Sequence, residues 1–271
     1  MGTFLKRFGN PLVLVFKNPI LFLPYIYTVS LLVFAALFSF FYSGAFNFVS
    51  SIDFSQFETQ QIEVYNFFFE NFLRIIISVV FFLSVLFVAG VSASAWRYSM
   101  ISKIVRKREI SGIFNSYREG ITHFWTVVFL NVLLFLLFIL VGIVSSAVLS
   151  LGFLFENVFF TAFLFLIIAL FIIFFRLAIL FRYPIIFMKD IGAYNSLKES
   201  TNLFLRNKWH VTKVFLCLMV IGASVTLSLV FVNALLLKIL PTFLIWIELL
   251  IRGLIFIIGS LWAEIFLFKS L

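Results

Sequence analysis

The sequence predicts an all-α polytopic membrane protein, a helix bundle with about six transmembrane segments. Its composition is the first indication, because 64% of the 271 residues are hydrophobic and 11% are charged, against about 45–50% and about 25% in soluble domains. The second is that apolar stretches recur from end to end, each close to the ~20 residues that cross a bilayer as a helix. The third is that basic residues flank these stretches. We therefore expect one integral membrane domain over residues 1–271.

The apolar stretches place the spans near residues 20–42, 72–98, 122–149, 156–183, 210–236 and 242–268. The connection at 43–71 contains four carboxylates and no Lys or Arg. Its aromatic and aliphatic residues recur at helical spacing, which favours an amphipathic helix on the outer membrane surface. A helical lead-in to the second span fits the same pattern equally well.

The distribution of Lys and Arg predicts the orientation, because loops on the cytoplasmic side are enriched in these residues. With both termini inside, sixteen of the twenty basic residues fall on the cytoplasmic side, while Arg74 and Lys238 lie outside and two more lie within spans. We expect a multi-pass protein of the plasma membrane with cytoplasmic N- and C-termini. The sixteen are Lys6, Arg7, Lys17, Arg97, Lys103, Arg106, Lys107, Arg108, Arg118, Arg182, Lys189, Lys198, Arg206, Lys208, Lys213 and Lys269.

Two cytoplasmic segments resemble each other. The second span ends in Trp96-Arg97-Tyr98 and the fourth in Phe181-Arg182-Tyr183, and the segments IFNSYREG (113–120) and AYNSLKES (193–200) follow them. A tryptophan then lies near the entry to the next span in both cases, at Trp125 and at Trp209. This similarity predicts an internal repeat with units near 1–98, 99–183 and 184–271.

The Ser-x-x-Glu pattern in both segments is typical of a capping box at a helix start. We expect Ser116 with Glu119, and Ser196 with Glu199, to cap two short interfacial helices on the cytoplasmic side. Residues 4–19 would be a diverged copy of the same helix. Each unit is then an interfacial helix followed by a two-span hairpin, and the three hairpins share one orientation because each crosses the membrane twice.

The motifs RYPIIFMKD (182–190), NSLKES (195–200) and NKW (207–209) carry a resemblance. Over residues 90–270 the chain resembles a broad group of bacterial and archaeal six-span membrane proteins. That group includes the membrane domain fused to some glycerophosphodiester phosphodiesterases. The resemblance implies a six-helix membrane domain and a link to lipid metabolism, and it carries over no catalytic residues.

Ionisable residues inside a membrane are costly, so they are candidate functional residues. Arg176, Glu248 and Arg252 are predicted to lie within spans four and six and form the candidate intramembrane polar site. Two interpretations remain open, a polar cavity or ion path and a set of structural pairs that fix helix register. Glu264, near the cytoplasmic end of span six, is expected within reach of Arg97 or Arg182.

Motifs of catalysis, phosphate binding and metal binding are missing from the sequence. There is no Gly-rich phosphate loop and no Gly-x-Ser-x-Gly, and the two aspartates, Asp53 and Asp190, are predicted on opposite membrane faces. His123 and His210 belong to no metal-ligand cluster. We expect no enzyme activity, no metal and no cofactor.

Three functional hypotheses remain. The first is a non-enzymatic module that binds or moves lipid or another amphiphile. The second is a small-solute permease or channel that uses the intramembrane charges. The third is a membrane scaffold that recruits a cytoplasmic partner through its interfacial helices. Membrane lipids are the expected partners and nucleic acid is not, because the basic residues flank apolar spans. A protein partner and a homo-oligomer both stay open.

Overall fold

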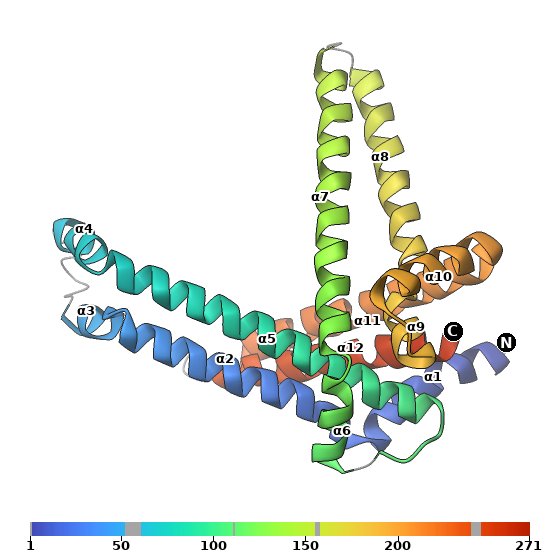
Figure 1. The fold of residues 1–271 in the computed structure, drawn as a ribbon, viewed down its shortest axis with the longest axis horizontal. Coiled ribbons are helices and arrows are strands. Elements are labelled where there is room, and N and C mark those ends of the chain that lie inside the picture. Colours follow the sequence, from blue (N-terminus) through green and yellow to red (C-terminus); the bar gives the residue numbers. More distant parts are fainter. Residues whose placement is uncertain (1, 52–60, 111, 155–157, 240–244) are drawn as a thin grey trace. The chain divides into compact units, whose positions relative to one another are not determined.

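The structure, a computed structural model, describes residues 2–51, 61–110, 112–154, 158–239 and 245–271. The described residues form helices and no strand (Figure 1). The chain divides into two compact units, Phe22–Ser94 and Met1–Leu21 with Ala95–Leu271. The predicted all-α fold is therefore confirmed. This division does not test the predicted single membrane domain over residues 1–271, which stays a prediction.

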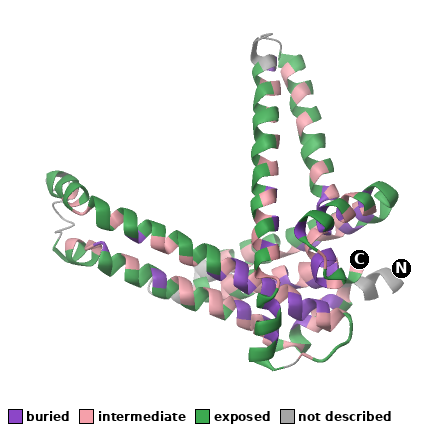
Figure 2. Cartoon of the chain, in the orientation of Figure 1, coloured by how far each residue is buried: buried purple, intermediate pink, exposed green. Residues whose placement is uncertain are grey.

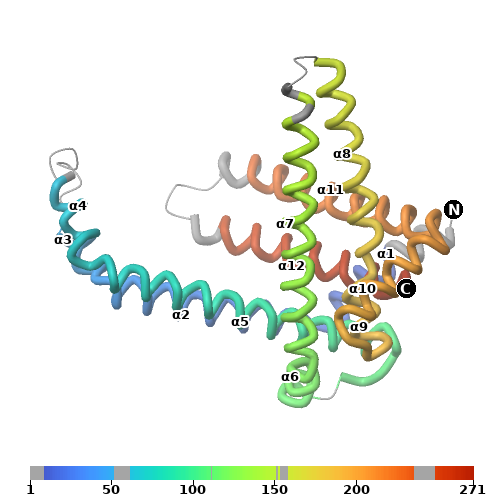
Figure 3. The backbone as a smooth tube through the Cα atoms, turned by 45° about the horizontal axis from the view of Figure 1, so that its top comes forward, coloured from blue at the N-terminus to red at the C-terminus, as the bar shows by residue number. Residues whose placement is uncertain are grey.

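The smaller unit holds α2 (Leu23–Tyr42), α3 (Ala45–Ser51), α4 (Gln61–Glu70) and the first part of α5 (Phe72–Val105). Helices α2 and α5 lie side by side (Figures 1 and 3). They are joined by a hydrogen bond from Ser39 Oγ to Ser78 O and by packing of Phe38 on Phe81. Between α4 and α5 only Asn71 interrupts the helices, as a lead-in to the second span requires. The predicted helix over 43–71 lies partly outside the described residues.

The larger unit contains the remaining helices together with the C-terminal part of α5. They are α1 (Gly2–Lys17), the short 3-10 turn η1 (Pro19–Phe22), α6 (Ile113–Ile121), α7 (Phe124–Leu154), α8 (Val158–Ala178), α9 (Arg182–Lys189), α10 (Ala193–Arg206), α11 (Lys208–Ile239) and α12 (Ile245–Ser270). Helices α7 and α8 form one hairpin, and α11 and α12 form another (Figure 3).

Six helical segments of the described chain are long and apolar enough to cross a membrane. They are Pro19–Tyr42, Phe72–Val105, Phe124–Ser150, Val158–Lys189, Lys208–Ala234 and Glu248–Ser270. The six predicted spans are thus confirmed in number and place, although the starts predicted at 156 and 242 lie outside the described residues. The second span extends past its predicted end because helix α5 continues without a break from Tyr98 to Val105. The fourth extends past its predicted end because α9 continues the chain after the short break that follows α8.

Burial is concentrated at one end of the helices of the larger unit. Buried residues gather on α9, α10, the C-terminal part of α12 and the part of α5 beside α6, whereas α7 and α8 are largely exposed along their length (Figure 2). One core cluster joins Phe181, Phe204, Ile221 and Phe266. Specific side-chain packing therefore lies where the short helices α6, α9 and α10 meet the long ones.

Candidate functional site

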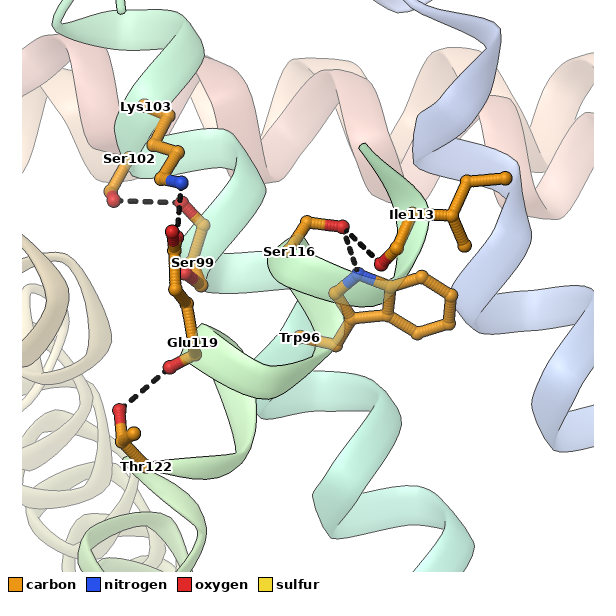
Figure 4. A network of polar contacts seen from close by, with 8 residues as sticks. All are labelled: Trp96, Ser99, Ser102, Lys103, Ile113, Ser116, Glu119 and Thr122. Atoms are coloured by element: carbon orange, nitrogen blue, oxygen red, sulfur yellow. Dashed lines mark hydrogen bonds and ion pairs between the residues drawn. The ribbon is translucent and has the colours of Figure 1, made fainter. Parts of the chain in front are cut away.

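Helix α6 is fixed against α5 through Trp96. The Trp96 indole Nε1–H donates to Ser116 Oγ at 3.0 Å, and that hydroxyl donates to Ile113 O (Figure 4). A Cβ at Gly120 would lie 2.5 Å from Trp96 Cα, so only glycine permits this approach of α6 to the α5 backbone. The ring of Tyr117 packs edge-on against Trp96. These contacts hold α6 rigidly at the end of the second span.

Helix α10 is fixed to the fourth span at the matching sequence position by a different bond. Between α8 and α9 the helix breaks, which leaves backbone groups without helical partners. Ser200, which aligns with Gly120, satisfies two of them: its hydroxyl donates to Ala178 O at 2.7 Å and accepts from Phe181 N–H at 3.2 Å. Ser200 and Phe181 are fully buried. At this position, a serine hydroxyl bonds the free backbone groups of the broken fourth span, whereas a glycine permits close approach to the continuous second span.

The predicted capping role of Ser116, Glu119, Ser196 and Glu199 is wrong. Both helices begin four residues earlier than that role requires, with Gly112 and Gly192 at the N-cap positions and no side-chain cap. Ser196 Oγ donates to Ala193 O, as Ser116 does to Ile113 O, so both hydroxyls turn back onto the first turn. The pattern failed because glycine, which needs no side-chain cap, can begin a helix.

The two glutamates instead form ion pairs with lysines of the preceding helix. Glu119 pairs with Lys103 of α5, and Glu199 pairs with Lys189 of α9 (Figure 4 shows the first). Both pairs are partly exposed to solvent, and exposed pairs contribute ~0–1 kcal/mol each. They orient α6 and α10 and add little to stability.

The N-terminal helix completes the arrangement. Helix α1 packs against α12, the sixth span, and α10 packs on α8 of the fourth. Helix α6 contacts the second span through Ser116 and Gly120. In two hairpins, a histidine at the start of the first span lies close to the end of the second. His123 Nδ1 lies 3.8 Å from Asp190 Oδ1, and His210 Nε2 lies 2.8 Å from Ser270 O. These matching contacts fit a threefold repeat, which stays a prediction.

An aromatic and ionic cluster lies where α5, α9 and α12 meet. The Tyr98 ring stacks on Tyr183 with centroids 4.8 Å apart, and Tyr183 Oη donates to Asn131 Oδ1 of α7 at 2.5 Å. Arg97 Nε lies 2.8 Å from Glu264 Oε2, with both side chains about 85% buried. The structure thus brings Arg97 and Glu264 together, two of the three residues anticipated there.

Arg182, the alternative partner of Glu264, has different neighbours. Its guanidinium donates to Ile179 O at 2.9 Å and lies over the Tyr183 ring. Ile179 lies in the break between α8 and α9, and its carbonyl oxygen also accepts the backbone N–H of Arg182 at 3.4 Å. The ion pair at the end of the sixth span therefore belongs to Arg97.

The candidate intramembrane residues separate into two places. Arg252 pairs with Glu248 on α12 and with Asn233 of α11, beside a groove of about 500 Å³. Arg176 instead lies over the ring of Phe138 in the α7–α8 hairpin, 5.1 Å from its centroid. The structure does not bring Arg176 to the Glu248–Arg252 pair. Asn233, which was not predicted, could have been found as the one amide within its apolar span.

Two grooves occupy matching positions between the start of a hairpin and the loop that follows it. The first, the basic groove, holds about 590 Å³ and is lined by Lys17, Asn18, Pro19, Ile20, Ile104, Lys107, Arg108, Glu109 and Ile110. The second, the aromatic groove, holds about 430 Å³ and is lined by Trp125, Thr126, Phe129, Gly192, Ala193, Tyr194 and Asn195. Of these two grooves, only the first is lined by cations.

In the described part of the chain, no group of three His, Cys, Asp or Glu residues could hold a metal ion. The fold and these sites define a multi-pass α-helical membrane protein. Comparison of the chain with known protein families, curated proteins and solved structures found no match.

Proposed function

We propose that this protein is a non-enzymatic membrane module that binds or moves lipid or another amphiphile. The observation that carries the proposal is the outward face of α6 and α10. Phe114 and Tyr194 stand at matching positions and are 88% and 66% exposed. Trp125 and Trp209, at the starts of the following spans, are 76% and 81% exposed.

Large exposed rings on short helices at the ends of spans suit the boundary between lipid head groups and acyl chains. Aromatic side chains are enriched at this level, and amphipathic helices lie there with their apolar face toward lipid. The buried contacts of Trp96 and Ser200 keep α6 and α10 in place, so their outward rings form a preorganised surface. We place this surface, with both termini, on the cytoplasmic side of the plasma membrane, because basic residues are concentrated there.

The resemblance of residues 90–270 to six-span proteins associated with glycerophosphodiester phosphodiesterases supports the same proposal. Those fusions join a membrane domain to a hydrolase of lipid-derived phosphodiesters. A membrane domain that presents or redistributes lipid is consistent with such a partner, and it needs no catalytic residue of its own.

Native mass spectrometry of the protein extracted from its own membrane, with a fluorescent-lipid redistribution assay in vesicles, tests the proposal. We expect specific lipid adducts above bulk abundance, and loss of those adducts in Phe114→Ser/Tyr194→Ser. The matched control is Tyr65→Ser/Phe69→Ser, which removes two exposed rings from α4. Adducts that mirror bulk lipid, together with unchanged lipid distribution, would contradict the proposal.

A second candidate, a path for a small polar solute, rests on the groove beside Arg252 and Asn233. Here the double variant Glu248→Gln/Arg252→Met removes both charges and should abolish solute flux into vesicles while the protein still folds. Unaltered flux would remove these residues from any transport role and leave them as a register-fixing pair.

A further inference from the structure

We propose that the basic groove binds the head group of an anionic phospholipid. This inference rests on the proposed lipid function and names the lipid class. Lys17 ends α1, and Lys107 and Arg108 follow the end of α5, so cations from two helices face one groove. Within the described residues, none of the three has an ion-pair partner.

The charge of the groove exceeds what its surroundings neutralise. Its three cations are opposed by one carboxylate, Glu109, which leaves a net charge of about two. The C-termini of α1 and α5 contribute about half a negative charge each. A net positive charge remains, and it attracts a phosphate group.

The apolar wall of the groove favours a lipid over a free anion. Pro19 and Ile20 begin the first membrane span, and Ile104 lies in the last turn of the second, so the groove lies at head-group level. Cations at this level with isoleucines beneath them match a phosphate joined to a glycerol and acyl chains. A soluble phosphate would use only the cations.

The backbone at Lys107 is itself unusual. Its φ of 55° is left-handed, and the turn is closed by Lys107 N–H to Ile104 O and by Arg108 N–H to Lys103 O. These two bonds form a Schellman motif, whose left-handed position is usually glycine. A lysine here is disfavoured conformationally, and it places an ammonium group at the groove. Such departures from local preference are typical of functional positions.

The aromatic groove provides an internal comparison. It occupies the matching place in the next hairpin and is lined by Trp125, Tyr194 and Asn195 without any cation. Selection for anionic head groups should therefore depend on the basic groove alone. Removing Lys17, Lys107 and Arg108 should abolish the preference without abolishing lipid binding elsewhere.

The test is native mass spectrometry of the full chain after reconstitution in phosphatidylcholine vesicles with a minor fraction of phosphatidylglycerol. The variant is Lys17→Gln/Lys107→Gly/Arg108→Gln, in which glycine suits the left-handed turn. The control, Arg206→Gln/Lys208→Gln/Lys213→Gln, removes the same charge from exposed positions outside the groove. We expect about fivefold weaker phosphatidylglycerol retention per cation removed, equivalent to ~1 kcal/mol each, and an unchanged control.

The outcomes separate this inference from the general lipid function. If the wild type retains phosphatidylcholine and phosphatidylglycerol in bulk proportion, or if the groove variant keeps the preference, the anionic site is refuted and lipid binding stands. If the wild type retains no lipid in this assay and redistributes none, the proposed function fails with it. Displacement of phosphatidylglycerol by inorganic phosphate alone would overturn the lipid assignment in favour of a free anion.

Discussion

Gly120→Ala tests whether close approach of α6 to α5 holds the two helices together. The added Cβ would lie 2.5 Å from Trp96 Cα, 2.9 Å from Trp96 N and 3.2 Å from Ala95 C. Ordinary carbon contacts are about 3.5–4.0 Å. All three neighbours are backbone atoms of a continuous helix, so no side chain can move aside. Helix α6 must shift by about 1 Å, the shortfall from normal contact.

The shift has a calculable cost. Overpacking of this kind destabilises by about 1–3 kcal/mol, and stretching the 3.0 Å Trp96–Ser116 hydrogen bond costs about 1 kcal/mol more. Alanine is the better helix former by about 1 kcal/mol, which offsets part of the loss. The net expectation is a destabilisation of about 1–3 kcal/mol.

The single cysteine provides the assay. Cys217 is partly buried in α11, so its labelling by a fluorogenic maleimide during heating in detergent reports unfolding. Gly142→Ala is the matched control, because Gly142 lies within helix α7 and a methyl group added there would meet nothing within 4 Å. We expect Gly120→Ala to unfold several degrees lower and the control to match or exceed the wild type. A Gly120→Ala protein as stable as the control would refute the close packing of α6.

Three further predictions use the same assay. Ser200→Ala leaves two buried backbone groups without partners and should cost about 2–4 kcal/mol, whereas Ser84→Ala, at an exposed helical hydroxyl, should change little; equal stability of the two variants would contradict the bonding of Ser200. Lys107→Gly relieves a left-handed residue and should be neutral or stabilising by up to about 1 kcal/mol, so a clear loss of stability would mean that the lysine itself supports the fold. Arg97→Met should cost about 3–5 kcal/mol by leaving Glu264 uncompensated, and Arg97→Met/Glu264→Gln should recover most of that loss; additive losses would show that the two residues are not coupled.

The spans could be predicted because length and apolar composition determine them almost alone. A helix is the structure that satisfies its own backbone in lipid, and the sequence supplies six stretches long enough. The closeness of Arg97 and Glu264 could also be anticipated, because an ionised side chain near the membrane is stabilised by a partner of opposite charge. Neither inference requires knowledge of how helices pack.

The roles of Gly120 and Ser200 could not be predicted, since they depend on whether the neighbouring span is continuous. The sequence shows a small residue at both positions, but a break at 179–181 in one span and not the other decides what that residue does. The helix starts were misplaced for a related reason. Ser116 and Ser196 fit a capping pattern, whereas tertiary contacts bury both hydroxyls.

The contact of Asn131 with Tyr183 could have been anticipated from the sequence. Asn131 is the one amide within its apolar span, and an amide in lipid needs a hydrogen-bond partner. The structure supplies Tyr183, which follows the partner helix of the same hairpin. A search for isolated amides in the spans would have indicated both this contact and that of Asn233 with Arg252.

The distribution of burial connects the fold to the proposed function. The most apolar window of each span has between 0% and 22% of its residues buried, so lipid covers most of the surface of the spans. Uniform apolar contact with lipid gives little geometric specificity, and the polar and aromatic contacts at the α6 and α10 end supply it instead. The same contacts fix the outward rings of α6 and α10. A change that loosens this end, such as Gly120→Ala, should therefore weaken lipid selection together with stability, while a change confined to the outward rings should affect lipid selection alone.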